Sequence, residues 1–168
     1  MKVIAVVGNP KRSSRTADAA VRLASALTDD EVDVIDLVDL GAGLLGWGDE
    51  RVAEAVAEVS SARLVVFASP TFKATYSGLL KLFLDQFDTG TGLGGVVAIP
   101  LMLGAGPAHA MAPDLLLKPV LVELGAICPA PGLYQLDSSY TSDPQLDRYI
   151  VTWGPVLRTL TTTEEALR

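Results

Sequence analysis

The chain has 168 residues, 49% of them apolar, with a formal net charge of −7 and a mean hydropathy of +0.37. This length predicts a single domain over residues 1–168 that buries a substantial core. The acidic balance argues against a nucleic-acid partner, and the lone cysteine, Cys128, excludes an internal disulfide and a zinc cluster built from thiolates.

Two uncharged stretches bear on where the protein resides. The apolar run at residues 3–7 is too short for the core of a signal peptide. Residues 89–113 carry no formal charge, but glycine and proline recur throughout them, which indicates a strand, a loop and a helix start rather than a membrane helix. We therefore expect no membrane segment and a location in the reducing cytoplasm.

Strand and helix patterns alternate along the chain. Short β-branched runs predict strands at residues 2–7, 31–37, 63–68, 95–103 and 126–134. Apolar residues three and four apart predict helices at residues 15–27, 49–60, 79–87, 110–124 and 149–160. Proline at 119 should kink the fourth helix or force a wide turn in it.

Such alternation predicts an α/β fold with a parallel sheet and helices on both faces. Five strands with right-handed crossovers favour the flavodoxin-like three-layer sandwich, in strand order 2-1-3-4-5. Ligands of such sheets bind beyond the carboxyl ends of the strands. The loops at residues 8–14, 69–77 and 104–108 should meet there.

The first loop has the chemistry of an anion site. It leads into a helix N-terminus, where free N–H groups and the helix dipole favour negative charge. It also holds three cations and three hydroxyls, namely Lys11, Arg12, Arg15, Ser13, Ser14 and Thr16. These cations and hydroxyls favour a bound phosphate over a helix cap with solvated charges. Because the Walker and dinucleotide glycine patterns are both absent, the favoured ligand is a mononucleotide or flavin phosphate.

The other two loops suit a flat ring. Pro70 fixes the chain direction after the third strand, and Phe72 offers an apolar contact, although the same loop reads equally well as a simple turn. Gly104 and Gly106 allow close backbone approach after the fourth strand. His109, the single histidine, lacks companions for a metal site and more often caps or packs than catalyses.

Together, these loops resemble a known family. The segments are GNPKRSSRT, SPTFKATYSGLLKLFLDQF and GAGPAHAMAPDLLLKPVLVELGA, within a match over residues 2–126. They resemble the signature segments of the NAD(P)H-dependent FMN reductases, most closely the reductase components of two-component monooxygenases such as the alkanesulfonate system. The resemblance implies FMN, NADPH or NADH as hydride donor, a homodimer or homotetramer, and a flavin-dependent monooxygenase as partner.

The resemblance also assigns residues by position. The family's phosphate loop corresponds to Lys11, Ser14, Arg15 and Thr16. The segment that runs along the isoalloxazine ring corresponds to Pro70, Thr71, Phe72 and Lys73. The loop at the other edge of the ring corresponds to Gly104, Ala105, Gly106 and His109. It assigns no counterpart to Arg12, no catalytic acid or base and no metal ligand, because the cofactor carries the hydride chemistry.

One position departs from the family. The alkanesulfonate-type reductases insert a tyrosine into the fourth helix as a wide turn at the tetramer interface, and Leu115 stands at the matching place here. The departure leaves open a related branch that keeps FMN bound and reduces quinones or other acceptors. A flavodoxin-type electron carrier and a phosphate binder without flavin are further alternatives, although flavodoxin phosphate loops are hydroxyl-rich rather than cationic.

Overall fold

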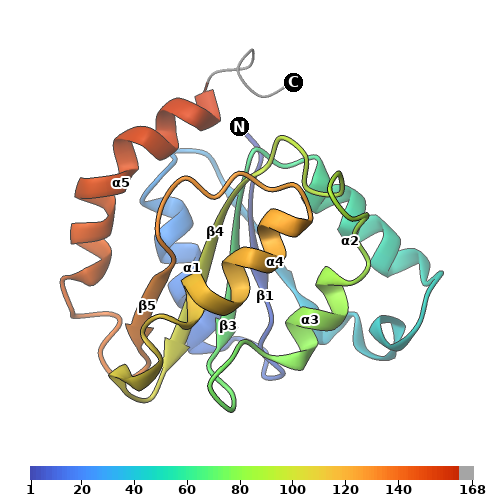
Figure 1. Ribbon diagram of the computed structural model, residues 1–168, viewed down its shortest axis with the longest axis horizontal. Helices are drawn as coiled ribbons and strands as arrows, with labels where there is room; N and C mark the ends of the chain where they lie inside the picture. Colours follow the sequence, from blue (N-terminus) through green and yellow to red (C-terminus); the bar gives the residue numbers. More distant parts are fainter. Residues whose placement is uncertain (163–168) are drawn as a thin grey trace.

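The computed structural model describes residues 1–162 and centres on a parallel sheet of five strands (Figure 1). The strands are β1 (Val3–Val7), β2 (Val32–Asp36), β3 (Leu64–Pro70), β4 (Val97–Gly104) and β5 (Leu133–Leu136). Their spatial order is β2-β1-β3-β4-β5, and every neighbouring pair is parallel. The predicted α/β class and flavodoxin-like strand order are confirmed.

Helices cover both faces of this sheet and complete the three layers (Figure 1). They are α1 (Arg15–Ser25), α2 (Glu50–Ser60), α3 (Gly78–Leu84), α4 (Lys118–Glu123) and α5 (Gln145–Thr162). One apolar cluster joins the sheet to α2, α3 and α4, and a second joins it to α1 and α5. Since successive strand side chains face opposite ways, Ile4 and Val6 enter the first cluster while Val3 and Ala5 enter the second. Burial on both faces accounts for the high apolar content.

Polar caps fix where the helices next to the site begin. Ser14 caps α1 by accepting a hydrogen bond from the N–H of Ala17 at 3.2 Å. Ser77 caps α3 by accepting one from the N–H of Leu80 at 3.1 Å. Both helices follow parallel strands, so both begin at the carboxyl edge of the sheet.

The observed elements differ from the predicted ones mainly at their ends. The expected loop at residues 41–48 contains a short 3₁₀ helix, Gly41–Leu45. Strand β3 continues to Pro70 because β4 remains alongside it, with Leu103 opposite Pro70. Helix α5 begins at Gln145, ahead of the expected start at residue 149.

The predicted fourth helix is divided at its proline. Residues Pro113–Leu117 form a π-helical turn in which the N–H of Lys118 donates to the carbonyl of Pro113, five residues back. Pro119 follows in the first turn of α4. It has no N–H to give to the carbonyl of Leu115, four residues back, so an ordinary α turn cannot close there. The expected wide turn is thus present.

The two tryptophans and α3 differ in how they pack against the core. The sequence favours core or interface packing for both tryptophans; Trp153 packs against the second apolar cluster, whereas Trp47 is 76% exposed and lies outside the core. The apolar residues of α3 face inward. Their side chains are buried or packed against the first cluster, namely Leu79, Leu80, Leu82, Phe83 and Leu84.

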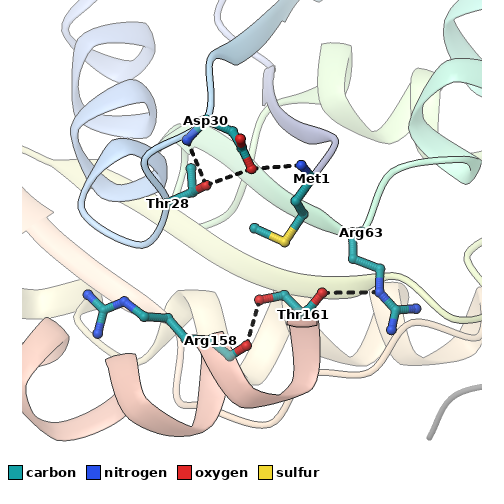
Figure 2. A network of polar contacts seen from close by, with 6 residues as sticks. All are labelled: Met1, Thr28, Asp30, Arg63, Arg158 and Thr161. Carbon is teal, nitrogen blue, oxygen red and sulfur yellow. Dashed lines mark hydrogen bonds and ion pairs between the residues drawn. The ribbon is translucent and has the colours of Figure 1, made fainter. Parts of the chain in front are cut away.

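A polar network closes the amino edge of the sheet, opposite the expected site (Figure 2). The terminal ammonium of Met1 donates to Asp30 at 2.7 Å, and Asp30 also accepts from the hydroxyl of Thr28. This ammonium holds the pKa of Asp30 below its usual value. Arg63 donates to the carbonyl of Thr161, which ties the end of α5 to β3. Within residues 1–162, no helix is long and apolar enough to cross a membrane.

Close packing at Gly8 yields a prediction about stability. A Cβ there would lie 2.5 Å from the Cβ of Leu80, closer than any real contact. We expect Gly8→Ala to lower the free energy of unfolding by about 2 kcal/mol, because α3 must shift away from β1. Urea denaturation measures the change.

The matched control is Gly78→Ala, at the start of α3, where an added Cβ meets nothing within 4 Å. It should be neutral or stabilise the fold by up to about 1 kcal/mol, since alanine is the better helix former. Equal stability of Gly8→Ala and the wild type would contradict the close packing.

Candidate active site

Two adjoining cavities lie at the carboxyl edge of the sheet. The first, of about 390 Å³, lies among the loops after β1, β3 and β4, with Asp137 beyond β5. The second, of about 580 Å³, lies between the loops after β3 and β4, against Tyr134 of β5. Thr71 and Ala105 line both. The three loops named from the sequence therefore meet as expected.

The first cavity is built around the start of α1. Strand β1 ends where the N–H of Gly8 donates to the carbonyl of Ala68, and the chain then turns sharply, with Ser13 in the left-handed region at φ 48°. Asn9 organises the turn, since it accepts from the N–H of Lys11 and donates to the hydroxyl of Thr16, both at 2.9 Å. The resulting concavity presents the first turn of α1, which favours an anion.

The cations of this loop separate into two groups. Lys11 and Arg15 line the first cavity, where Arg15 donates to the carbonyl of Asp137 at 3.0 Å and lies 3.5 Å from its carboxylate. Arg12 instead pairs with Asp39, after β2, at 2.5 Å and does not line either cavity. Arg12, which had no counterpart in the family pattern, thus braces the loop from outside.

A carboxyl beneath the loop has an unusual environment. Asp36 ends β2, and one of its carboxylate oxygens is buried without a hydrogen-bond partner among the described residues. Burial, and then the charge of Asp39, raise the pKa of Asp36, while the backbone of Val38 and Ser13 and the charge of Arg12 act in the opposite direction. Asp36 therefore carries its charge at a cost to the fold.

The loop after β3 is a strained hairpin. Phe72 and Thr75 exchange two backbone hydrogen bonds, of 2.8 and 3.1 Å, across a turn formed by Lys73 and Ala74. Both turn residues have positive φ, 50° and 72°, although such turns favour asparagine and glycine. This strain of non-glycine residues beside a cavity is characteristic of functional sites.

The loop after β4 lies against β5. The hydroxyl of Tyr134 donates to the carbonyl of Gly106 at 2.7 Å. A Cβ on Gly104 would lie 1.8 Å from that hydroxyl, so only glycine fits where the two strands meet. Thr71 projects a buried hydroxyl oxygen, with no partner in the described part of the chain, where the two cavities adjoin. This leaves an unused hydrogen-bonding group at the centre of the site.

All twelve residues predicted for the cofactor line one of the two cavities. The first cavity takes Lys11, Ser14, Arg15, Thr16, Pro70, Thr71, Phe72, Gly104 and Ala105, and the second adds Lys73, Gly106 and His109. Their binding roles stay a prediction. Among residues 1–162 there is no group of three or more histidine, cysteine, aspartate or glutamate side chains that could hold a metal ion.

Among the polar residues that line the cavities, sequence reasoning missed three: Asn9, Tyr134 and Asp137. Asn9 lies within the first loop but carries neither charge nor a family assignment. Tyr134 and Asp137 belong to the end of β5, whose carboxyl edge is next to that of β4. The strand order alone was signal enough to find them.

Comparison with known proteins agrees with this architecture. Residues 1–141 match the family model "NADPH-dependent FMN reductase". The chain therefore belongs to the FMN reductase family.

Individual relatives span nearly the same length. An FMN reductase (NADPH) of Pseudomonas aeruginosa is 31% identical, over 92% of this chain and 84% of the relative. The NADH-dependent FMN reductase SfnF of Pseudomonas fluorescens is 30% identical, over 86% and 83%. The crystal structure of the NADH:FMN oxidoreductase EMOB, in apo form, superposes with a TM-score of 0.87 at 28% identity, over 99% of this chain and 93% of that one.

The raised pKa of Asp36 gives a pH-dependent prediction. Its carboxyl favours the fold fully below the unfolded pKa of 3.8, and this contribution is lost as the pH rises through the folded-state pKa. Asp36→Asn should therefore raise the free energy of unfolding at pH 7, by up to about 1 kcal/mol given the solvent near this group. The gain should shrink as the pH falls toward 4.

Urea denaturation at several pH values measures this difference. Asp33→Asn, at an exposed position on the same strand, is the control and should change stability by less than about 0.5 kcal/mol. A gain from Asp36→Asn that is the same at pH 4 and pH 7 would show that charge burial is not its cause.

Proposed function

We propose that this chain catalyses hydride transfer from NAD(P)H to FMN. One observation supports this proposal above all: at one edge of the sheet, a helix start suited to an anion lies next to a second cavity with few charged groups. The chain is also a member of the FMN reductase family. Relatives named for NADPH and for NADH both support a nicotinamide donor.

The residues present suit FMN. The N-terminus of α1 with Ser14, Thr16, Lys11 and Arg15 would hold the phosphate, since it combines N–H groups, hydroxyls and positive charge. The unpartnered hydroxyl of Thr71, at the junction of the cavities, would meet the polar edge of the ring. When bound, FMN supplies the hydride-accepting chemistry.

The protein then contributes position and electrostatics. The loops after β3 and β4 lie on rigid strand ends and would hold the ring of a bound flavin in a fixed position for the donor. Backbone N–H groups of these loops would stabilise negative charge on that ring. No side chain needs to transfer a proton in the hydride step.

We further propose that the reduced flavin is passed to a flavin-dependent monooxygenase and that the protein works as a cytoplasmic homodimer or homotetramer. Exposed apolar side chains on and around α4 support self-association, namely Met111, Leu115, Leu116 and Val122.

Oxidation of NADPH on addition of FMN tests the proposed hydride transfer, and no oxidation above the flavin-free rate would refute it.

The phosphate assignment is tested by comparing two flavins. Arg15→Ala should weaken FMN binding about tenfold, because it removes a charge-assisted contact to the phosphate. Ser14→Ala should also weaken FMN binding, since the helix start loosens with its cap. Riboflavin, which lacks the phosphate, should bind both variants as it binds the wild type. Fluorescence quenching on titration measures both affinities.

Arg22→Ala is the matched control, because Arg22 lies on the same helix and pairs with Asp18 away from both cavities. It should leave both flavins unaffected. Equal losses of FMN and riboflavin in Arg15→Ala would mean that the first cavity does not hold the phosphate.

A further inference from the structure

The second cavity has a distinctive charge. Its lining includes one lysine, Lys73, and one histidine, His109, but no aspartate or glutamate. The protein as a whole carries seven more negative than positive charges. A cavity lined by no acidic side chain, in a protein that is acidic overall, is suited to an anionic ligand.

The lysines of the chain differ in whether their ammonium groups have a partner. Lys2, Lys81 and Lys118 each form an ion pair, with Glu58, Asp85 and Asp114 respectively. In the described part of the chain, the side chains of the two remaining lysines, Lys11 and Lys73, form neither a hydrogen bond nor an ion pair. Lys11 lines the first cavity and Lys73 the second. Each cavity is thus lined by one lysine whose ammonium has no partner among the described residues.

The backbone fixes the position of Lys73. It occupies the left-handed region at φ 50°, inside a two-residue turn closed by both hydrogen bonds between Phe72 and Thr75. Asparagine or glycine would relieve the strain, but neither would supply a cation. A strained turn that retains lysine at its tip, beside a cavity, points to a role for the ammonium in binding.

We propose that the Nζ of Lys73 binds a phosphate group of the nicotinamide dinucleotide. The proposal rests on the proposed function, and it gives the two free lysines separate tasks. Lys11 serves the flavin phosphate in the first cavity, while Lys73 serves the second substrate. The phosphate is either the 2′-phosphate of NADPH or the diphosphate that NADPH and NADH share.

The experiment compares Lys73→Gln with Lys11→Gln, since glutamine keeps much of the length and removes only the charge. Steady-state rates are measured at saturating FMN with three donors: NADPH, NADH and reduced nicotinamide riboside. Calorimetric titration of NADP⁺ into the FMN-loaded protein gives affinity without turnover. Fluorescence titration gives the affinity for FMN.

Lys73→Gln should raise KM for NADPH about tenfold and weaken NADP⁺ binding by a similar factor, and these losses should exceed any loss of FMN affinity. Lys11→Gln should show the reverse, with weaker FMN and unchanged KM for NADPH. Reduced nicotinamide riboside, which carries no phosphate, should be unaffected by Lys73→Gln. Lys73→Arg should restore the binding of NADP⁺, because it returns the charge.

The donors separate the two sources of phosphate. A loss confined to NADPH identifies the 2′-phosphate, and an equal loss for NADPH and NADH identifies the diphosphate. Unchanged KM and NADP⁺ affinity in Lys73→Gln would overturn the proposal, as would an equal loss for the riboside. A wild-type protein that fails to oxidise NADPH with FMN refutes the proposed function itself, whereas an active wild type with an unaffected variant refutes only the role of Lys73.

Discussion

The site depends on one buried hydroxyl. Ser77, only 3% exposed, donates to the carbonyl of Gly8 and accepts from the N–H of Leu80, while its own N–H donates to the buried hydroxyl of Ser69. The end of β1, the loop after β3 and the start of α3 are joined in this way. Loss of the hydroxyl would leave a buried carbonyl and a helix N–H without partners, and unpaired polar groups in a core lower the free energy of unfolding.

This junction explains why the two cavities adjoin. Gly8 brings β1 so close to α3 that no side chain fits between them, and the loop after β3 is therefore held beside the loop after β1. The hydroxyl of Thr71 then falls where the cavities meet. A ligand with a phosphate at one end and a flat ring at the other matches this layout, because the charged groups gather in one cavity and the second is nearly free of them.

Much of this arrangement could be predicted from the sequence, for physical reasons. Strand order follows from alternation and handedness, so the convergence of the three loops follows as well. What could not be predicted depends on contacts between distant residues. The pairing of Arg12 with Asp39, the burial of Asp36 and the fit of Tyr134 against Gly104 each require the register of neighbouring strands. The exposure of Trp47 could not be predicted because a tryptophan in the short connection after a 3₁₀ helix carries no periodic signal.

The wide turn before α4 shows how a family feature persists when its characteristic residue changes. The resemblance to the alkanesulfonate-type reductases leads one to expect an inserted tyrosine where this chain has Leu115, yet the π turn is present. Pro119 accounts for it, since a residue without an N–H cannot close the α turn back to Leu115, and the hydrogen bonding shifts to a five-residue spacing. The turn is thus encoded by the proline, and the side chain that it presents is free to vary. Here that side chain is apolar and 65% exposed, so what the turn offers a neighbour is hydrophobic contact without a hydroxyl.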